Sequence, residues 1–141
     1  MRILIINGPN LNLLAKREPE KYGGRAFEDY LAELRSAFPD AVLEFFQSNI
    51  EGELIDLVHG ADGHCNGIVI NAGGYSHNSV ALRDAIAAVR VPVIEVHITN
   101  VLDREQFRHV SMIGGVCIGT VMGLGLDGYR LAVDHLMRIK E

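Results

Sequence analysis

The chain has few cysteines, no excess of positive charge and no long apolar run, and each absence excludes a class of protein. Two cysteines, Cys65 and Cys117, stand at no metal-binding or redox spacing within 141 residues. So sparse a pair favours a reducing compartment, and Cys117, inside an apolar run, is expected to be a small buried hydrophobic residue. The 13 lysines and arginines against 18 acidic residues give a net charge of -5, which lacks the basic footprint of a nucleic-acid-binding protein.

Apolar residues never continue far enough to cross a membrane. The N-terminal run at residues 3–6 is too short for a signal peptide, and Asn7-Gly-Pro-Asn interrupts it. No stretch approaches the ~20 apolar residues of a membrane span. We therefore expect a cytoplasmic protein with no membrane partner. We also expect no metal, because four histidines fit no metal-ligand spacing: His59, His64, His109 and His135.

Short apolar runs alternate with segments of helical period along the whole chain. This alternation predicts βα units around a parallel sheet. Five strands are expected, at residues 3–6, 42–46, 68–70, 93–96 and 116–118. Helices are expected at residues 27–38, around 54–58, at 79–89 and at 124–139. The length fits one domain, residues 1–141. The predicted class is a doubly wound α/β domain with about five parallel strands and helices on both faces.

Polar side chains follow three of the predicted strands. Asn7 and Asn10 follow the first strand, Asn71 ends the third, and His97 and Asn100 end the fourth. In a doubly wound domain, ligands bind in the crevice beyond the carboxyl ends of the strands. The sequence therefore predicts a binding site for a small molecule at this edge of the sheet.

Two side chains at the end of the fourth strand suit acid–base chemistry. Glu95 lies two residues before His97 and hence on the same face of the strand. A carboxylate in that place orients the imidazole and favours its protonated form, as a general acid requires. The alternative is a strand-end histidine that only serves local backbone groups.

The loop after the first strand contains a candidate base. Residues 7–24 are long for a βα connection, and such loops are usually lids or binding loops. Tyr22 could act as a base if its pKa fell by roughly 3 units, which corresponds to about 4 kcal/mol. Arg17 and Arg108 are the candidate guanidinium groups that would stabilise the phenolate. The alternative is that Tyr22 only packs the loop and Arg17 is a solvated surface charge.

Two glycine-containing motifs resemble cofactor-binding loops. Gly123-x-Gly125-x-x-Gly128 matches the dinucleotide fingerprint by letter, but the chain ends before the acidic ribose ligand that the motif requires. We expect these glycines to allow close packing of the last helix. Asn71-Ala-Gly-Gly lacks the Walker lysine, although its backbone N–H groups could hold a small anion such as a carboxylate. No cofactor is expected.

Seven short sequence strings occur in order, at compatible spacing, and span nearly the whole chain. They are Asn7-Gly-Pro-Asn-Leu-Asn-Leu-Leu, Arg17-Glu-Pro-Glu-Lys-Tyr-Gly, Gln47-Ser-Asn-Ile-Glu-Gly, Asn71-Ala-Gly-Gly-Tyr-Ser-His, Arg83-Asp-Ala, Glu95-Val-His and Phe107-Arg-His. Together these strings resemble the type II 3-dehydroquinate dehydratases. The resemblance implies a flavodoxin-like fold, in agreement with the class predicted above, and the elimination of water from 3-dehydroquinate to 3-dehydroshikimate through an enolate.

The resemblance also implies the catalytic roles. Tyr22 matches the base that removes a proton from the carbon next to the ketone, and Arg17 matches the residue that favours the tyrosinate. Asn10 matches the group that stabilises the enolate oxygen, through a water. His97 matches the general acid that protonates the departing hydroxyl, with Glu95 behind it.

Substrate binding and assembly are implied in the same way. A carboxylate-binding set and a set of partners for the ring hydroxyls are both present, and Asp84 could reach the site of a neighbouring subunit. The first set is Asn71 with the backbone of Ile98 and Thr99, and the second is His77, Asp84 and Arg108. The resemblance further implies a mobile lid at about residues 13–24 and a homododecamer built as a tetramer of trimers, with the substrate as the only small-molecule partner.

The chain departs from the usual family pattern at a few positions. Thr99 replaces a common serine but keeps a hydroxyl and the backbone N–H, and Leu102 and Asp103 stand where a His-Ala pair is more common. Ala15 and Ala26 replace a common glycine and a common threonine, and the first could stiffen the lid. These departures bear on rate and inhibitor response more than on the type of reaction.

Three alternatives are weaker. A Schiff-base dehydratase is a (β/α)₈ barrel of about 250 residues, and the only lysines here are Lys16, Lys21 and Lys140, none at a strand end. A flavodoxin-like binding module needs a phosphate loop after the first strand, where Pro9 removes an N–H donor. A pseudoenzyme is disfavoured because every matched catalytic position is chemically intact.

The reaction that the resemblance implies serves both aromatic amino acid biosynthesis (the shikimate pathway) and quinate breakdown, and the sequence favours neither.

Overall fold

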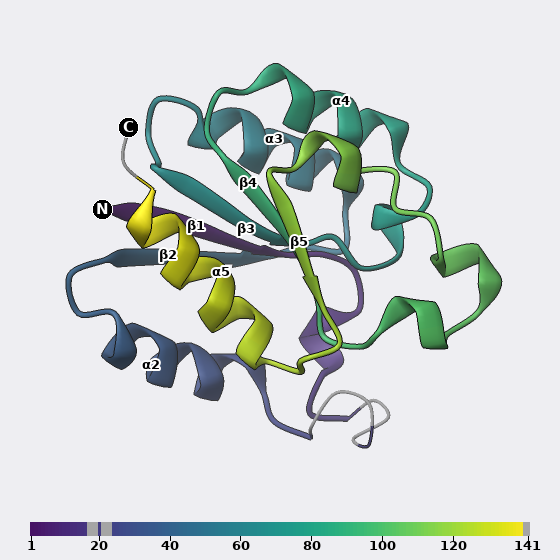
Figure 1. Ribbon diagram of the computed structural model, residues 1–141, viewed down its shortest axis with the longest axis horizontal. Coiled ribbons are helices and arrows are strands. Elements are labelled where there is room, and N and C mark those ends of the chain that lie inside the picture. Colours follow the sequence, from purple (N-terminus) through teal and green to yellow (C-terminus); the bar gives the residue numbers. More distant parts are fainter. Residues whose placement is uncertain (17–19, 21–23, 140–141) are drawn as a thin grey trace.

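The protein forms a five-stranded parallel sheet with helices on both faces (Figure 1). A computed structural model describes residues 1–16, 20 and 24–139. The strand order is β2-β1-β3-β4-β5, the flavodoxin-like order, which confirms the predicted fold class. The strands are β1 Arg2–Asn7, β2 Val42–Gln47, β3 Gly67–Asn71, β4 Val93–His97 and β5 Gly119–Met122.

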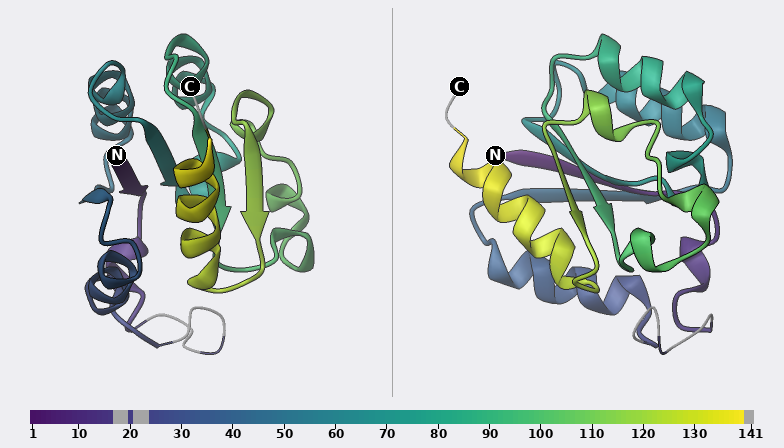
Figure 2. Two further views of the ribbon diagram at one scale, coloured as in Figure 1. Left: turned by 60° about the vertical axis from the view of Figure 1, so that its left-hand side comes forward. Right: turned by 45° about the vertical axis from the view of Figure 1, so that its right-hand side comes forward.

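Two pairs of helices cover the sheet, one pair on each face (Figure 2). Because successive side chains of a strand point to opposite faces, Ile3 and Ile5 of β1 pack with one pair, and Leu4 and Ile6 pack with the other. The first pair is α2 (Phe27–Ala37) with α5 (Asp127–Arg138), and the second is α3 (Glu51–Ala61) with α4 (Val80–Ala88). Burial on both faces explains why β1 is an uninterrupted apolar run. Among the described residues, no helix combines the length and the apolar character needed to span a membrane.

Short 3-10 turns follow the strands β1, β3 and β4 along the chain. They are η1 (Leu11–Leu13), η2 (Gly73–Ser76), η3 (Val101–Asp103), η4 (Gln106–Arg108) and η5 (Gly114–Val116). The connection from β4 to β5 consists of three of these turns, η3, η4 and η5. The polar residues at the ends of β1, β3 and β4 are therefore followed by short turns.

The predicted position of the last strand is wrong. We expected it at residues 116–118, but those residues belong to or follow η5, and β5 begins at Gly119. The apolar residues Val116 and Cys117 pack toward the core on the α3–α4 side instead. The strand itself lies at the edge of the sheet and is partly exposed, so it needs no apolar run. Cys117 is half-buried, which is less than predicted, and burial raises the pKa of its thiol to about 12.

The C-terminal helix begins later than expected. Helical period predicted a start at residue 124, but α5 starts at Asp127. Gly123 and Gly125 have φ angles of 85° and 62°, which an α-helix excludes. A Cβ atom on Gly128 would lie 3.3 Å from a side-chain atom of Val96. The glycines therefore turn the chain and allow close packing of the helix against the sheet, as predicted.

Candidate active site

A cavity of about 110 Å³ lies at the carboxyl edge of the sheet. It is lined by residues from the loop after β1, the end of β3 with η2, the end of β4, and η4. Seven of the predicted site residues line it: Asn10, Asn71, His77, His97, Ile98, Thr99 and Arg108. The structure therefore brings together most of the described residues that the sequence had singled out.

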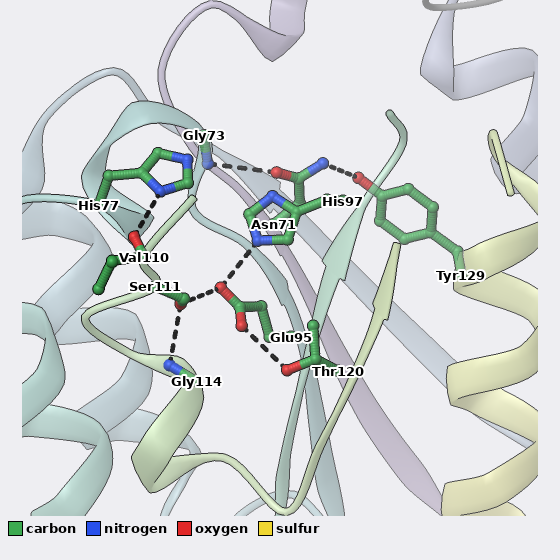
Figure 3. A network of polar contacts seen from close by, with 10 residues as sticks. All are labelled: Asn71, Gly73, His77, Glu95, His97, Val110, Ser111, Gly114, Thr120 and Tyr129. Carbon is green, nitrogen blue, oxygen red and sulfur yellow. Dashed lines mark hydrogen bonds and ion pairs between the residues drawn. The ribbon is translucent and has the colours of Figure 1, made fainter. Parts of the chain in front are cut away.

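The centre of the site is a buried contact between the His97 imidazole and the Glu95 carboxylate (Figure 3). The His97 Nε2 atom lies 2.8 Å from Glu95 Oε2, and the two side chains are 7% and 0% exposed. This contact confirms the expected carboxylate behind the imidazole. Because Nε2 is engaged by Glu95, Nδ1 is the ring nitrogen that remains for a ligand in the cavity.

Two hydroxyl groups that sequence analysis missed complete the surroundings of Glu95. The Ser111 hydroxyl donates to Oε2 at 2.6 Å, and the Thr120 hydroxyl donates to Oε1 at 3.0 Å. The backbone N–H of Gly114 in turn donates to Ser111 Oγ at 3.0 Å. With His97, the Glu95 carboxylate has three hydrogen-bond partners, which stabilise its anionic form.

The electrostatic balance at Glu95 favours its ionised form. Burial alone would raise the pKa of its carboxyl group. The hydrogen bonds from His97 and Ser111, the charge of His97 and the hydrogen bond from Thr120 outweigh burial, and the pKa lies below its ordinary value of 4.5. A lowered pKa adds stability that is fully present above 4.5 and is lost as the pH falls through the lower folded value.

This linkage predicts the acid stability of the Glu95→Gln variant. Glutamine keeps the shape but cannot be ionised, so we expect the variant's free energy of unfolding to be lower by about 1.5–3 kcal/mol near pH 7, the range for hydrogen bonds to charged groups. The difference should shrink as the pH falls below 4.5. Urea denaturation in steps from about pH 7 to about pH 3 measures it. Glu28→Gln, on the exposed side of α2, is the control, and a difference that does not change with pH would contradict the prediction.

His77 stacks on His97 and is held in one tautomer. The two ring centroids are 5.8 Å apart with an interplanar angle of 23°. His77 Nδ1 lies 2.9 Å from the Val110 carbonyl oxygen, so it carries the hydrogen and donates. Burial lowers the pKa of His77, and the neighbouring His97 and Arg108 lower it further, against the hydrogen bond to Val110. The neutral ring then presents Nε2 as an acceptor for a hydroxyl group.

Asn10 reaches the cavity through a constrained turn after β1. Gly8 comes so close to the loop after β3 that a Cβ atom on it would lie 2.6 Å from the Ala72 carbonyl oxygen. Asn10 follows with a φ of 70°, a left-handed conformation that asparagine tolerates. Its backbone N–H donates to Asn49 Oδ1 at 3.0 Å. The loop after β1 therefore lies between the ends of β2 and β3 and contacts both.

Glu95 lies behind His97 rather than in the cavity lining, and three further predicted residues are not placed in the cavity. Tyr22 and Arg17 lie outside the described residues, and their roles stay predictions. Asp84 is exposed on α4 and does not line the cavity. Its suggested reach into a neighbouring subunit's site also stays a prediction.

One group of described residues has the spacing of metal ligands, and it lies away from the cavity. Glu44, His64 and Cys65 have potential ligand atoms within 4.8 Å of one another. The Glu44 carboxylate already forms an ion pair with Arg2, and this guanidinium opposes a second cation. The spacing of His64 in the sequence did not indicate a metal site with Glu44 and Cys65. We interpret the group as an ion-pair cluster.

Sequence analysis also missed Tyr129. Its buried hydroxyl on α5 contacts both Asn7 and Asn71 at the strand ends. The available signal was weak, because Tyr129 shares a helical stripe with Ala132, Val133 and other core residues. A buried tyrosine does, however, need a polar partner.

Comparisons with known proteins agree along almost the whole chain. A family model described as dehydroquinase class II matches residues 1–137. The 3-dehydroquinate dehydratase of Exiguobacterium sp. is 52% identical over 138 residues, which are 97% of this chain and 94% of that protein. The 3-dehydroquinate dehydratase 2 of Pseudomonas putida is 48% identical over 145 residues, covering 99% of this chain and 95% of that protein.

Solved structures give the same result. The crystal structure of type II dehydroquinase from Butyrivibrio crossotus matches with a TM-score of 0.94 at 45% identity, covering 97% of each chain. That of type II dehydroquinase from Propionibacterium acnes matches with a TM-score of 0.91 at 39% identity, covering 96% of this chain and 94% of that chain. With the fold, the strand-end residues and these matches in agreement, the chain belongs to the class II dehydroquinase family.

Proposed function

We propose that this protein eliminates water from 3-dehydroquinate to give 3-dehydroshikimate, with a tyrosinate as the base and an imidazolium as the general acid. The dehydratase activity follows from membership of the family and from relatives about half identical in sequence. The observation that best supports the mechanism is the buried His97–Glu95 pair beside the cavity. No step of this mechanism uses a metal or a cofactor.

The general acid acts on the leaving group. Hydroxide leaves poorly, so the departing oxygen needs a proton in the transition state, and a positioned acid accelerates such a step by about 10²–10⁴. His97 supplies this proton from Nδ1, while ionised Glu95 stabilises the positive charge of the ring before transfer. The hydrogen bonds from Ser111 and Thr120 keep Glu95 in place and charged.

The base acts on the carbon next to the ketone. Tyr22, as a tyrosinate, takes a proton from that carbon, and Arg17 stabilises the phenolate. The electron pair moves to the ketone oxygen and forms an enolate, which Asn10 stabilises through a water. The return of this pair expels the protonated hydroxyl as water, so charge and atoms balance. The string Arg17-Glu-Pro-Glu-Lys-Tyr-Gly supports these assignments by its resemblance to the family.

The remaining cavity residues bind the substrate. Asn71 and the backbone of Ile98 and Thr99 hold the carboxylate, and His77 and Arg108 hold ring hydroxyls. Neutral His77 suits this role because its free Nε2 accepts a hydrogen bond. We extend the proposal to a single catalytic domain over residues 1–141 and a lid at about residues 13–24. It also includes a homododecamer in which Asp84 serves a neighbouring subunit, as the family resemblance implies.

A direct assay tests the proposed function. Purified protein mixed with 3-dehydroquinate should produce the ultraviolet absorbance of a conjugated enone. Borohydride added with substrate should leave the activity intact, because no lysine forms a Schiff base. The absence of an absorbance change, or covalent trapping of the substrate on the chain, would contradict the proposal.

A further inference from the structure

We infer that Tyr129 is a positioning residue, whose buried hydroxyl fixes the orientation of the Asn71 amide and thereby sets the affinity for the substrate. The inference rests on the proposed function, in which Asn71 binds the substrate carboxylate. Tyr129 itself does not line the cavity. It acts through Asn71.

The hydrogen bonds around Asn71 allow one orientation of its amide (Figure 3). The Tyr129 hydroxyl has a single hydrogen, which it donates to Asn7 Oδ1 at 2.7 Å. Its oxygen can therefore only accept from Asn71, whose Nδ2 lies 3.0 Å away. On the other side, the backbone N–H of Gly73 can only donate, and it lies 3.2 Å from Asn71 Oδ1. Both hydrogen bonds require the same orientation of the amide, with Oδ1 toward Gly73 and Nδ2 toward Tyr129.

This orientation suits an anion in the cavity. Asn71 Oδ1 is engaged by the Gly73 N–H, and one hydrogen of Nδ2 is engaged by Tyr129. The second hydrogen of Nδ2 remains available to an acceptor such as a carboxylate oxygen. The reversed amide would turn its oxygen toward Tyr129, lose the Gly73 hydrogen bond and present no donor in the same place. Tyr129 thus helps to select the anion-binding state.

The packing around position 129 does not by itself require a hydroxyl group. The Tyr129 ring is fully buried and lies edge-on to Phe27, with centroids 4.8 Å apart. A phenylalanine would keep this contact and avoid the cost of burying a hydroxyl. The partners that offset this cost are Asn7 and Asn71, which face each other in the register of β1 and β3. The Tyr129 hydroxyl therefore links helix α5 to the carboxyl edge of the sheet.

Tyr129→Phe tests the inference, with Tyr30→Phe as a matched control. Tyr30 belongs to the same apolar cluster, 6.3 Å from Tyr129 between ring centroids, and within the described part of the chain its hydroxyl bonds neither amide. We expect Tyr129→Phe to raise KM for 3-dehydroquinate about tenfold, which corresponds to about 1.4 kcal/mol, while kcat changes less than about threefold. Tyr30→Phe should leave both constants unchanged.

A second variant keeps the test independent of how Tyr129→Phe folds. Asn7→Ala removes the acceptor of the Tyr129 hydrogen, which is then free to turn toward Asn71 and favour the reversed amide. It should also raise KM with little loss of kcat. A lower unfolding temperature with an unchanged KM in the folded variants would mean a merely structural role and overturn the inference. A wild-type protein without activity would instead overturn the proposed function and this inference with it.

Discussion

Tyr22→Phe is expected to lower kcat by about 10³-fold or more, toward the upper end of what a positioned base contributes. Phenylalanine keeps the aromatic ring but has no proton to lose, so no tyrosinate can form. A residue that only packed the loop would tolerate this change. The variant therefore separates the two interpretations of this loop tyrosine, and the enone absorbance assay with saturating 3-dehydroquinate measures the difference.

Exchange of substrate hydrogen with D₂O shows whether proton removal is the step that Tyr22→Phe loses. In D₂O, wild-type protein should exchange the hydrogen that the base removes, because the enolate can return to substrate before the hydroxyl leaves. Tyr22→Phe should show neither exchange nor product, although it should still bind the substrate. Turnover within tenfold of wild type would mean that another group removes the proton, and the assignment of the tyrosinate would fail.

The sheet and the edge that holds the site were predictable because local patterns encode them. Strands buried on both faces require continuous apolar runs, and such runs end where the chain becomes polar. Asn71 and His97 were found in this way, at the ends of two neighbouring parallel strands. The position of Glu95 followed from the two-residue period of a strand. None of these inferences needed contacts between distant parts of the chain.

The residues that hold the site in place were not predictable because their partners are distant in sequence. Ser111 and Thr120 reach Glu95 from 16 and 25 residues away. Thr120 was further hidden because the last strand was expected three residues too early. Tyr129 is 122 residues from Asn7 and has the spacing of an ordinary core residue on its helix. Periodicity reports which face of an element is buried, but it does not report which polar atom meets which.

His97→Gln is expected to lower kcat by about 10²–10⁴-fold, the contribution of a positioned general acid. Glutamine can still donate a hydrogen bond to Glu95, so the carboxylate in the core keeps a partner and the fold should survive. It cannot carry a transferable proton, so the hydroxyl would have to leave as hydroxide. KM should change little, because the residues proposed to bind the carboxylate and the ring hydroxyls remain.

The two proposed proton transfers predict opposite exchange behaviour for the His97→Gln and Tyr22→Phe variants. Proton removal precedes loss of the hydroxyl if an enolate forms, so this variant should exchange hydrogen for deuterium in D₂O while making little product. Tyr22→Phe should do neither. Mass spectrometry of recovered 3-dehydroquinate measures the exchange, and near-UV circular dichroism controls for folding. If His97→Gln lost exchange together with turnover, the two proton transfers would be coupled in one step, and the separate enolate would have to be abandoned.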